Sequence, residues 1–160
     1  MPLYPDLLKH QDSYAAIADT GVSIMYHELF DFSVRIADTV KPNSLVFSFC
    51  ENTIGSLAGS VAFLNNGVVP LLLDAVRNRQ LLDHLLDTYQ PAYIYLPSSM
   101  CQDFPEFKLC LMGFDYALLQ TNYTEQIPLH KDLAMLFTTS GSTGSPKLVR
   151  LSIENLRENG

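Results

Sequence analysis

Between residues 136 and 147 the chain reads Leu136-Phe137-Thr138-Thr139-Ser140-Gly141-Ser142-Thr143-Gly144-Ser145-Pro146-Lys147. From Thr138 to Ser145 every residue is glycine or carries a small hydroxyl group, and no carboxylate interrupts the run before Lys147. Glycines let successive backbone N–H groups turn toward one point, hydroxyls donate to phosphate oxygens, and a lysine adds a mobile positive charge. The composition therefore predicts a phosphate-binding loop. A flexible Gly/Ser linker is disfavoured, because an apolar strand is expected on each side.

The residues that follow the lysine alternate between apolar and polar side chains. The apolar ones are Val149, Leu151 and Ile153, and the polar ones are Arg150 and Ser152. A period of two predicts a β-strand, so we expect the loop to join one strand to another.

A Walker P-loop is the main alternative for a loop of this composition. It needs G-x-x-x-x-G-K followed by Ser or Thr, ahead of a helix. Counted from Gly141, Pro146 stands at the position of the second glycine and Leu148 follows the lysine. A P-loop NTPase or kinase is therefore the less favoured interpretation.

Nine consecutive positions, Thr139 to Lys147, resemble the signature loop of the adenylate-forming enzymes. This superfamily includes acyl-CoA synthetases, adenylation domains of nonribosomal peptide synthetases, and luciferases. Weaker similarity, at residues 26–29 and 51–71, extends the resemblance along much of the chain. The family often has glycine where this chain has Leu148, and often histidine where Ile153 stands.

The resemblance implies an ATP-dependent ligase. A carboxylic acid and ATP would give an acyl-adenylate and pyrophosphate, and the acyl group would then form a thioester on coenzyme A or on the phosphopantetheine of a carrier protein. ATP and Mg²⁺ are the implied cofactors. The implied fold is α/β: a mainly parallel βαβ sheet with flanking helices, the first part of the adenylate-forming N-terminal domain.

The same resemblance implies the role of each loop residue. Gly141 and Gly144 would form the backbone nest, and Lys147 would be the catalytic charge on the departing pyrophosphate. Thr143 would be a second catalytic residue and lie near the magnesium ion. Hydroxyl contacts to the phosphates are assigned to Thr139, Ser140, Ser142 and Thr143.

In the resembling family the loop falls early in a much longer enzyme. The adenine-, ribose- and acyl-binding groups, and the catalytic lysine of the C-terminal domain, come later. We therefore expect residues 1–160 to be a partial N-terminal AMP-binding domain, with its phosphate loop at 138–147 and without the C-terminal domain. Alone it should be inactive. Its partners should be a small carboxylic acid and the rest of its own chain.

Composition limits the remaining possibilities. The chain has 160 residues, 48% of them hydrophobic and 17% charged, which fits one soluble domain with a core. Its net charge of −7 argues against a nucleic-acid partner. Between Lys131 and Arg150 the only acid is Asp132, so the surroundings of the loop are locally basic.

No targeting or metal-binding pattern is visible. The three cysteines, Cys50, Cys101 and Cys110, show no ligand spacing and no paired framework. The N-terminus lacks the basic and apolar regions of a secretion signal, and the longest apolar run, 68–73, is too short to span a membrane. Cytoplasm is the expected location.

Hydrophobic periodicity predicts alternating strands and helices, and hence βαβ units. The predicted strands are 45–49, 68–73, 92–96, 116–119 and 133–137. The predicted helices run from Tyr26 to Val40, from Ile54 to about Asn65, and from Leu81 to Tyr89, with a further helix after an N-cap at Ser152. Gly55 and Gly59 should let the second of these helices pack closely.

Three weaker local predictions complete the assignment. Residues 14–18 form a short helix before Thr20-Gly21. Asn52 is the N-cap of the helix that follows it. Residues 97–113 are irregular.

Three other functions were considered. Residues 27–31 resemble H-E-x-x-H, but position 31 is Asp31, so a zinc site is disfavoured. The loop lacks the G-x-S-x-G spacing of a hydrolase. A non-catalytic nucleotide-binding or scaffold module stays open, because a fold does not determine a function.

Overall fold

The computed structural model describes residues 4, 6–74, 79–123, 127–139 and 147–158, and of Thr139 and Lys147 it describes the backbone. A seven-stranded sheet with the strand order β6-β7-β5-β3-β4-β8-β9 organises this part of the chain. Its strands are β3 (Leu45–Cys50), β4 (Val69–Asp74), β5 (Tyr93–Pro97), β6 (Lys108–Gly113), β7 (Tyr116–Gln120), β8 (Leu133–Thr139) and β9 (Lys147–Ser152).

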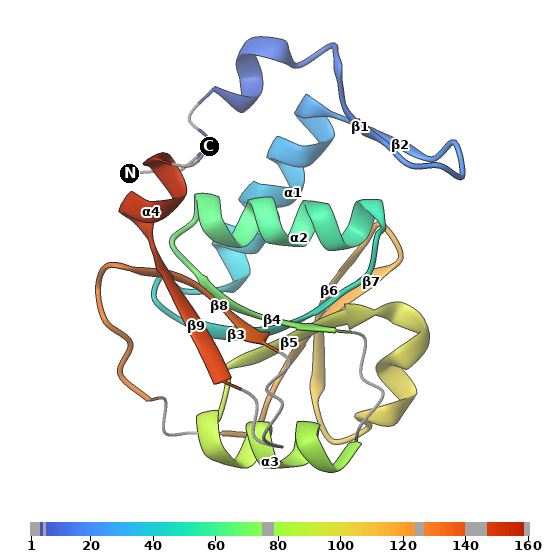
Figure 1. Ribbon diagram of the computed structural model, residues 1–160. Helices are drawn as coiled ribbons and strands as arrows, with labels where there is room; N and C mark the ends of the chain where they lie inside the picture. The colour runs from blue at the N-terminus through green and yellow to red at the C-terminus, as the bar shows by residue number, and fades with distance from the viewer. Residues whose placement is uncertain (1–3, 5, 75–78, 124–126, 140–146, 159–160) are drawn as a thin grey trace.

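The four central strands, β5, β3, β4 and β8, are parallel to one another, and the pairs β5–β7, β6–β7 and β8–β9 are antiparallel. Figure 1 shows helices α1 (Tyr26–Thr39) and α2 (Ile54–Asn65) above the sheet and α3 (Arg79–Tyr89) below it. The predicted α/β fold, a mainly parallel sheet with flanking helices, is confirmed.

Apolar side chains bury the sheet on both faces. One core lies between the sheet and helices α1 and α2, and a second lies between the sheet and α3. Strand β3 is buried on both sides, as its continuous apolar run predicts. Neighbouring positions of β3 serve opposite cores, with Val46 in the first and Phe47 in the second.

Helix α2 lies unusually close to the sheet, as its glycines predict. A Cβ atom at Gly59 would stand 2.1 Å from Cε1 of Tyr95, and one at Gly55 would stand 2.3 Å from the carbonyl oxygen of Phe114. The tyrosine hydroxyl crosses the same interface and donates a hydrogen bond of 2.8 Å to the carbonyl oxygen of Gly55. The helix ends at Asn65, Asn66 is its C-cap, and Gly67 adopts φ +65° as expected of a C-terminal stop.

The short helix predicted at residues 14–18 is wrong. Residues Tyr14–Ile17 form β1, which pairs with β2 (Ser23–Met25) as a separate antiparallel ribbon. A helix this short is not stable by itself, and the turn at Gly21, with φ +84°, returns the chain so that the two segments can pair.

Two further local predictions need correction. The N-cap of α2 is Thr53, whose Oγ1 accepts a hydrogen bond of 3.3 Å from the backbone N–H of Ser56, so Asn52 is not the cap. Residues 97–113 are not irregular, because they contain a 3₁₀ helix, η2 (Ser98–Asp103), and strand β6. The β6–β7 turn has Phe114 and Asp115 at its two central positions, both at positive φ and neither of them glycine, so the usual hairpin signal is missing.

The remaining elements are a 3₁₀ helix, η1 (Leu7–His10), and the last helix, α4 (Ile153–Glu158). Within the described residues every helix is too short or too polar to cross a bilayer.

Candidate functional site

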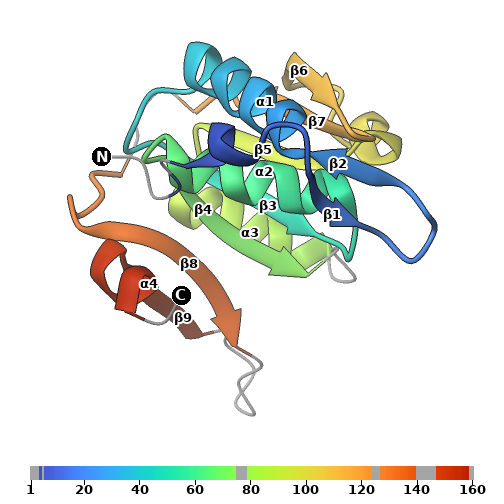
Figure 2. The same cartoon turned by 90° about the horizontal axis from the view of Figure 1, so that it is seen from above.

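The carboxyl ends of the parallel strands meet at one edge of the sheet. The register places Cys50, the last residue of β3, beside Asp74, the last residue of β4, and places Leu72 of β4 beside Phe137 of β8. Figure 2 shows the arrowheads of β3, β4 and β8 pointing to the same side. Open α/β sheets bind ligands outside this edge, so it is the place to look for a site.

Strand β8 delivers the predicted loop to this edge. In the β8–β9 pair Thr138 lies opposite Leu148, and Thr139 lies opposite Lys147. The loop thus joins strand to strand, as the alternation after Lys147 predicts. Because opposite residues of an antiparallel pair lie ~5 Å apart, the two ends of the loop start from one point of the edge.

Most of the predicted site residues cannot be placed. Ser140, Gly141, Ser142, Thr143 and Gly144 lie outside the described residues, and so do the side chains of Thr139 and Lys147. What the structure brings together is the backbone of Thr139 and Lys147. The assigned contacts to phosphate and magnesium stay predictions.

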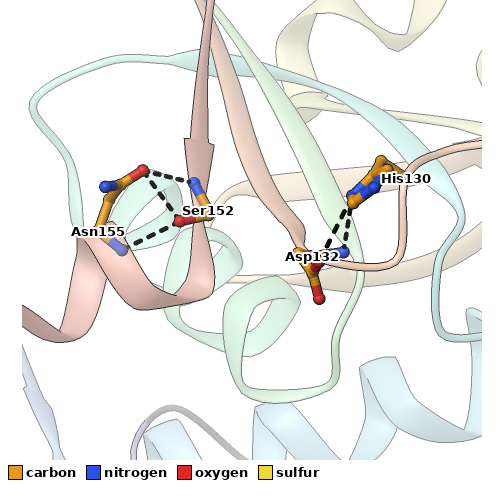
Figure 3. A network of polar contacts seen from close by, with 4 residues as sticks. All are labelled: His130, Asp132, Ser152 and Asn155. Carbon is orange, nitrogen blue, oxygen red and sulfur yellow. Dashed lines mark hydrogen bonds and ion pairs between the residues drawn. The ribbon is translucent and has the colours of Figure 1, made fainter.

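The opposite end of the hairpin is tied down by a polar network (Figure 3). The hydroxyl of Ser152 accepts a hydrogen bond of 3.1 Å from the backbone N–H of Asn155 and donates one of 2.9 Å to the Asn155 side-chain oxygen. The backbone N–H of Ile153 donates to the carbonyl oxygen of Asp132, at 3.2 Å. The predicted N-cap at Ser152 is confirmed. The bond from Ile153 to Asp132 joins the start of α4 to the residue before β8.

A cavity of about 460 Å³ opens at the same edge, between the ends of β3 and β5. Three acidic residues line it, Asp19, Glu51 and Asp115, and none of the described residues in its lining is a lysine or an arginine. Such a lining repels phosphate groups. We therefore do not expect phosphate to bind in this cavity.

Sequence reasoning missed this cavity, because four separate segments of the chain build it, at residues 18–22, 51–55, 97–99 and 114–116. One of them is the β6–β7 turn, where the backbone N–H of Ser98 donates to the carbonyl oxygen of Asp115 at 2.8 Å. The two central positions of the turn have no glycine, and nothing in the local sequence shows that the turn reaches the end of β5.

Two titratable groups near the ends of β3 and β7 are kept neutral. Burial raises the pKa of the Cys50 thiol, and burial raises the pKa of the Tyr116 phenol. The Tyr116 hydroxyl donates a hydrogen bond of 3.1 Å to the carbonyl oxygen of Phe49. Neither group is poised as a base or nucleophile near pH 7.

Comparison with known proteins gives these features a context. The chain is 27% identical over 148 residues to the NRPS-like oxidoreductase fscA of Fusarium equiseti, and 26% identical over 149 residues to tyrocidine synthase 3 of Brevibacillus parabrevis. Its fold matches that of apo MatB from Rhodopseudomonas palustris, with a TM-score of 0.70, 22% identity and 99% of this chain covered. The chain is a relative of the adenylate-forming enzymes. No family model matches it.

The chain spans a small part of each of these adenylate-forming relatives. The matched regions make up 14% of fscA, 2% of tyrocidine synthase 3 and 36% of the MatB chain, while covering 87%, 89% and 99% of this chain. The similarity to MatB covers the sheet and its flanking helices and therefore extends well beyond the loop.

The adenylate-forming fold also bears on the Walker alternative. In a Walker P-loop the lysine begins a helix, whose N-terminus supports the phosphates. Here Lys147 begins strand β9, so no helix N-terminus follows the lysine directly. The P-loop NTPase interpretation has no support in the fold or in the relatives.

Proposed function

We propose that the protein containing this chain is an ATP-dependent ligase that forms acyl-adenylates, and that residues 138–147 bind the phosphates of ATP. The observation that carries the proposal is the hairpin register, which puts Thr139 opposite Lys147 at the carboxyl edge of the sheet. MatB, which has the same fold, is also known in an ATP-bound form.

In the proposed reaction an oxygen of the substrate carboxylate attacks the α-phosphorus of ATP. A new O–P bond forms, the bond from the α-phosphorus to the bridging oxygen breaks, and pyrophosphate leaves with that electron pair. Negative charge grows on the leaving group. Donors fixed in place before the reaction stabilise this charge without reorganisation, which is the main contribution expected of the loop.

The loop residues divide this task by their chemistry. The amides around Gly141 and Gly144 form the nest, and the hydroxyls of Ser140 and Ser142, with those of Thr139 and Thr143, donate to phosphate oxygens. The ammonium group of Lys147 contacts the departing pyrophosphate. No carboxylate lies in the run from 133 to 147 to neutralise its charge.

A magnesium ion at this site would be bound mainly by phosphate oxygens and only to a small extent by protein side chains. Among the described residues no group of three His, Cys, Asp or Glu side chains is arranged to hold a metal ion. Mg²⁺ often keeps several waters and binds mainly phosphate oxygens, so one hydroxyl, that of Thr143, is a sufficient contribution from the loop. The ion would neutralise part of the triphosphate charge when bound.

The further steps belong to the whole protein. A thioester with coenzyme A or a carrier phosphopantetheine would follow the adenylate, in the cytoplasm. Because the chain spans 36% of MatB, we propose that the groups for adenine, ribose and the acyl chain lie elsewhere in a longer enzyme. Residues 1–160 alone should then show no adenylation.

The test is pyrophosphate exchange by the full-length protein, with a panel of amino acids, fatty acids and aryl acids. Lys147→Ala and Thr143→Val should each lower the exchange rate by about 100-fold, because each removes a donor to the developing charge. Thr143→Ser should retain most of the activity, and Lys131→Ala, which removes a lysine outside the loop, should change little.

Unchanged exchange in both loop variants would remove the assigned roles. Calorimetry with ATP and Mg²⁺ separates the two remaining functions. Binding of ATP without exchange for any acid in the panel would instead support a non-catalytic nucleotide-binding or scaffold module.

A further inference from the structure

The residue after Lys147 packs against the core on the α3 side. Leu148 is half-buried and packs against the core on the α3 side, which includes Leu71 and Leu136. Its cross-strand partner is Thr138, and this pair is next to the pair of Thr139 and Lys147, from which the loop starts. Leu148 is therefore the packed side chain of β9 nearest to Lys147 in the described residues.

The rest of that face of β9 offers no comparable anchor. Side chains on one face of a strand recur every second residue, so Leu148 shares its face with Arg150 and Ser152. Arg150 is exposed, and Ser152 is engaged in capping α4. In the part of β9 that the structure describes, Leu148 alone joins the core on the α3 side.

The position of β9 makes this anchor important. Strand β9 is the last strand in the described sheet order, so its backbone pairs with β8 on one side (Figure 1). The strand that carries Lys147 is therefore positioned by its ladder with β8 and by the packing of Leu148. A glycine at position 148 would remove the packing of this strand on the α3 side.

From this packing we infer that Leu148 is a positioning residue for Lys147, and the inference rests on the proposed function. Burial of Leu148 fixes the backbone from which the lysine side chain extends. A displacement of about 1 Å in a charge that stabilises a transition state can cost up to ~100-fold in rate. Leu148 thus acts through its neighbour and touches no substrate.

The experiment is a double-mutant cycle in the full-length protein, measured by pyrophosphate exchange at several ATP concentrations. Leu148→Ala should lower kcat/KM about tenfold when Lys147 is present. In the Lys147→Ala background the same change should have less than about a twofold effect, because no charge is left to misplace. Leu148→Met should keep most of the activity.

Leu151→Ala is the matched control, since Leu151 is a half-buried leucine of the same strand near its far end. It should lower the urea midpoint about as much as Leu148→Ala and leave kcat/KM within about twofold. Equal effects of Leu148→Ala in both backgrounds, or an equal loss of activity in Leu151→Ala, would overturn the inference.

The two proposals fail in different ways. If the wild-type protein shows no exchange with any acid, or Lys147→Ala is as active as wild type, the proposed function is wrong. If Lys147→Ala is impaired and Leu148→Ala equals wild type, the positioning role alone is wrong.

Discussion

Single residues determine how closely helix α2 approaches the sheet. Gly59 faces the ring of Tyr95, which is 1% exposed and donates its hydroxyl to the Gly55 carbonyl on the same helix. The ring also lies 5.3 Å from that of Phe63, in an edge-to-face arrangement. The tyrosine is held from three directions and has little freedom to move away from an added methyl group.

Gly59→Ala should therefore destabilise the fold. Alanine favours a helix over glycine by about 1 kcal/mol, but its Cβ would stand 2.1 Å from Tyr95 Cε1. Overpacking of this kind costs ~1–3 kcal/mol, and an approach of 2.1 Å calls for the upper end of that range, so after the helix gain we expect a net loss of about 2 kcal/mol. Urea denaturation measures it. Ser60→Ala, the next position, should stay within about 0.5 kcal/mol. Equal midpoints for the two variants would contradict the close approach.

Among the elements, α2 shows how a helix start is decided. Asn52 and Thr53 are both good capping residues and adjacent in sequence. The structure selects Thr53, which has extended backbone angles of φ −132° and ψ 160° and a hydroxyl near the Ser56 N–H. The direction in which β3 leaves the sheet makes this choice, and periodicity cannot show it.

Thr53→Ala should cost about 1 kcal/mol of stability, the usual value of an N-cap. Asn52→Ala changes an exposed neighbour without a cap and should cost less than about 0.5 kcal/mol. Both values follow from urea denaturation of matched samples. A larger loss in Asn52→Ala than in Thr53→Ala would show that the cap is Asn52.

At the level of the whole molecule, the core between the sheet and helices α1 and α2 buries two tyrosines, Tyr95 and Tyr116, whose hydroxyls must stay protonated. Burial raises the pKa of Tyr95 far above its ordinary value, and burial also raises the pKa of Tyr116. In the unfolded chain both titrate near pH ~10. Above that pH the unfolded state has released protons that the folded state retains, so the free energy of unfolding must fall as pH rises.

Below about pH 9 the two tyrosines should not change the free energy of unfolding. Above pH ~10 each tyrosine should lower it by up to ~1.4 kcal/mol per pH unit. Urea denaturation between pH 8 and pH 11 measures the slope. Tyr95→Phe should lower stability at pH 8, because the bond to Gly55 is lost, and should make the alkaline slope shallower by one proton. An unchanged slope would show that Tyr95 ionises in the folded state.

Local sequence determined most of the secondary structure and the candidate loop. Amphipathic and continuous apolar runs predict α1, α2, α3 and the central strands correctly, because burial imposes its period on neighbouring residues. The loop is recognisable from composition alone, since glycines, hydroxyls and a lysine suit phosphate whatever surrounds them.

Only the tertiary structure decided the strand order, the β1–β2 ribbon in place of a helix, and the pairing of Thr139 with Lys147. It also decided that Leu148 packs against the α3-side core and that acidic turns surround the ends of β3 and β5. Each of these depends on contacts between residues distant in sequence or on competition between neighbours, and the free energy of such contacts is not encoded in any local period.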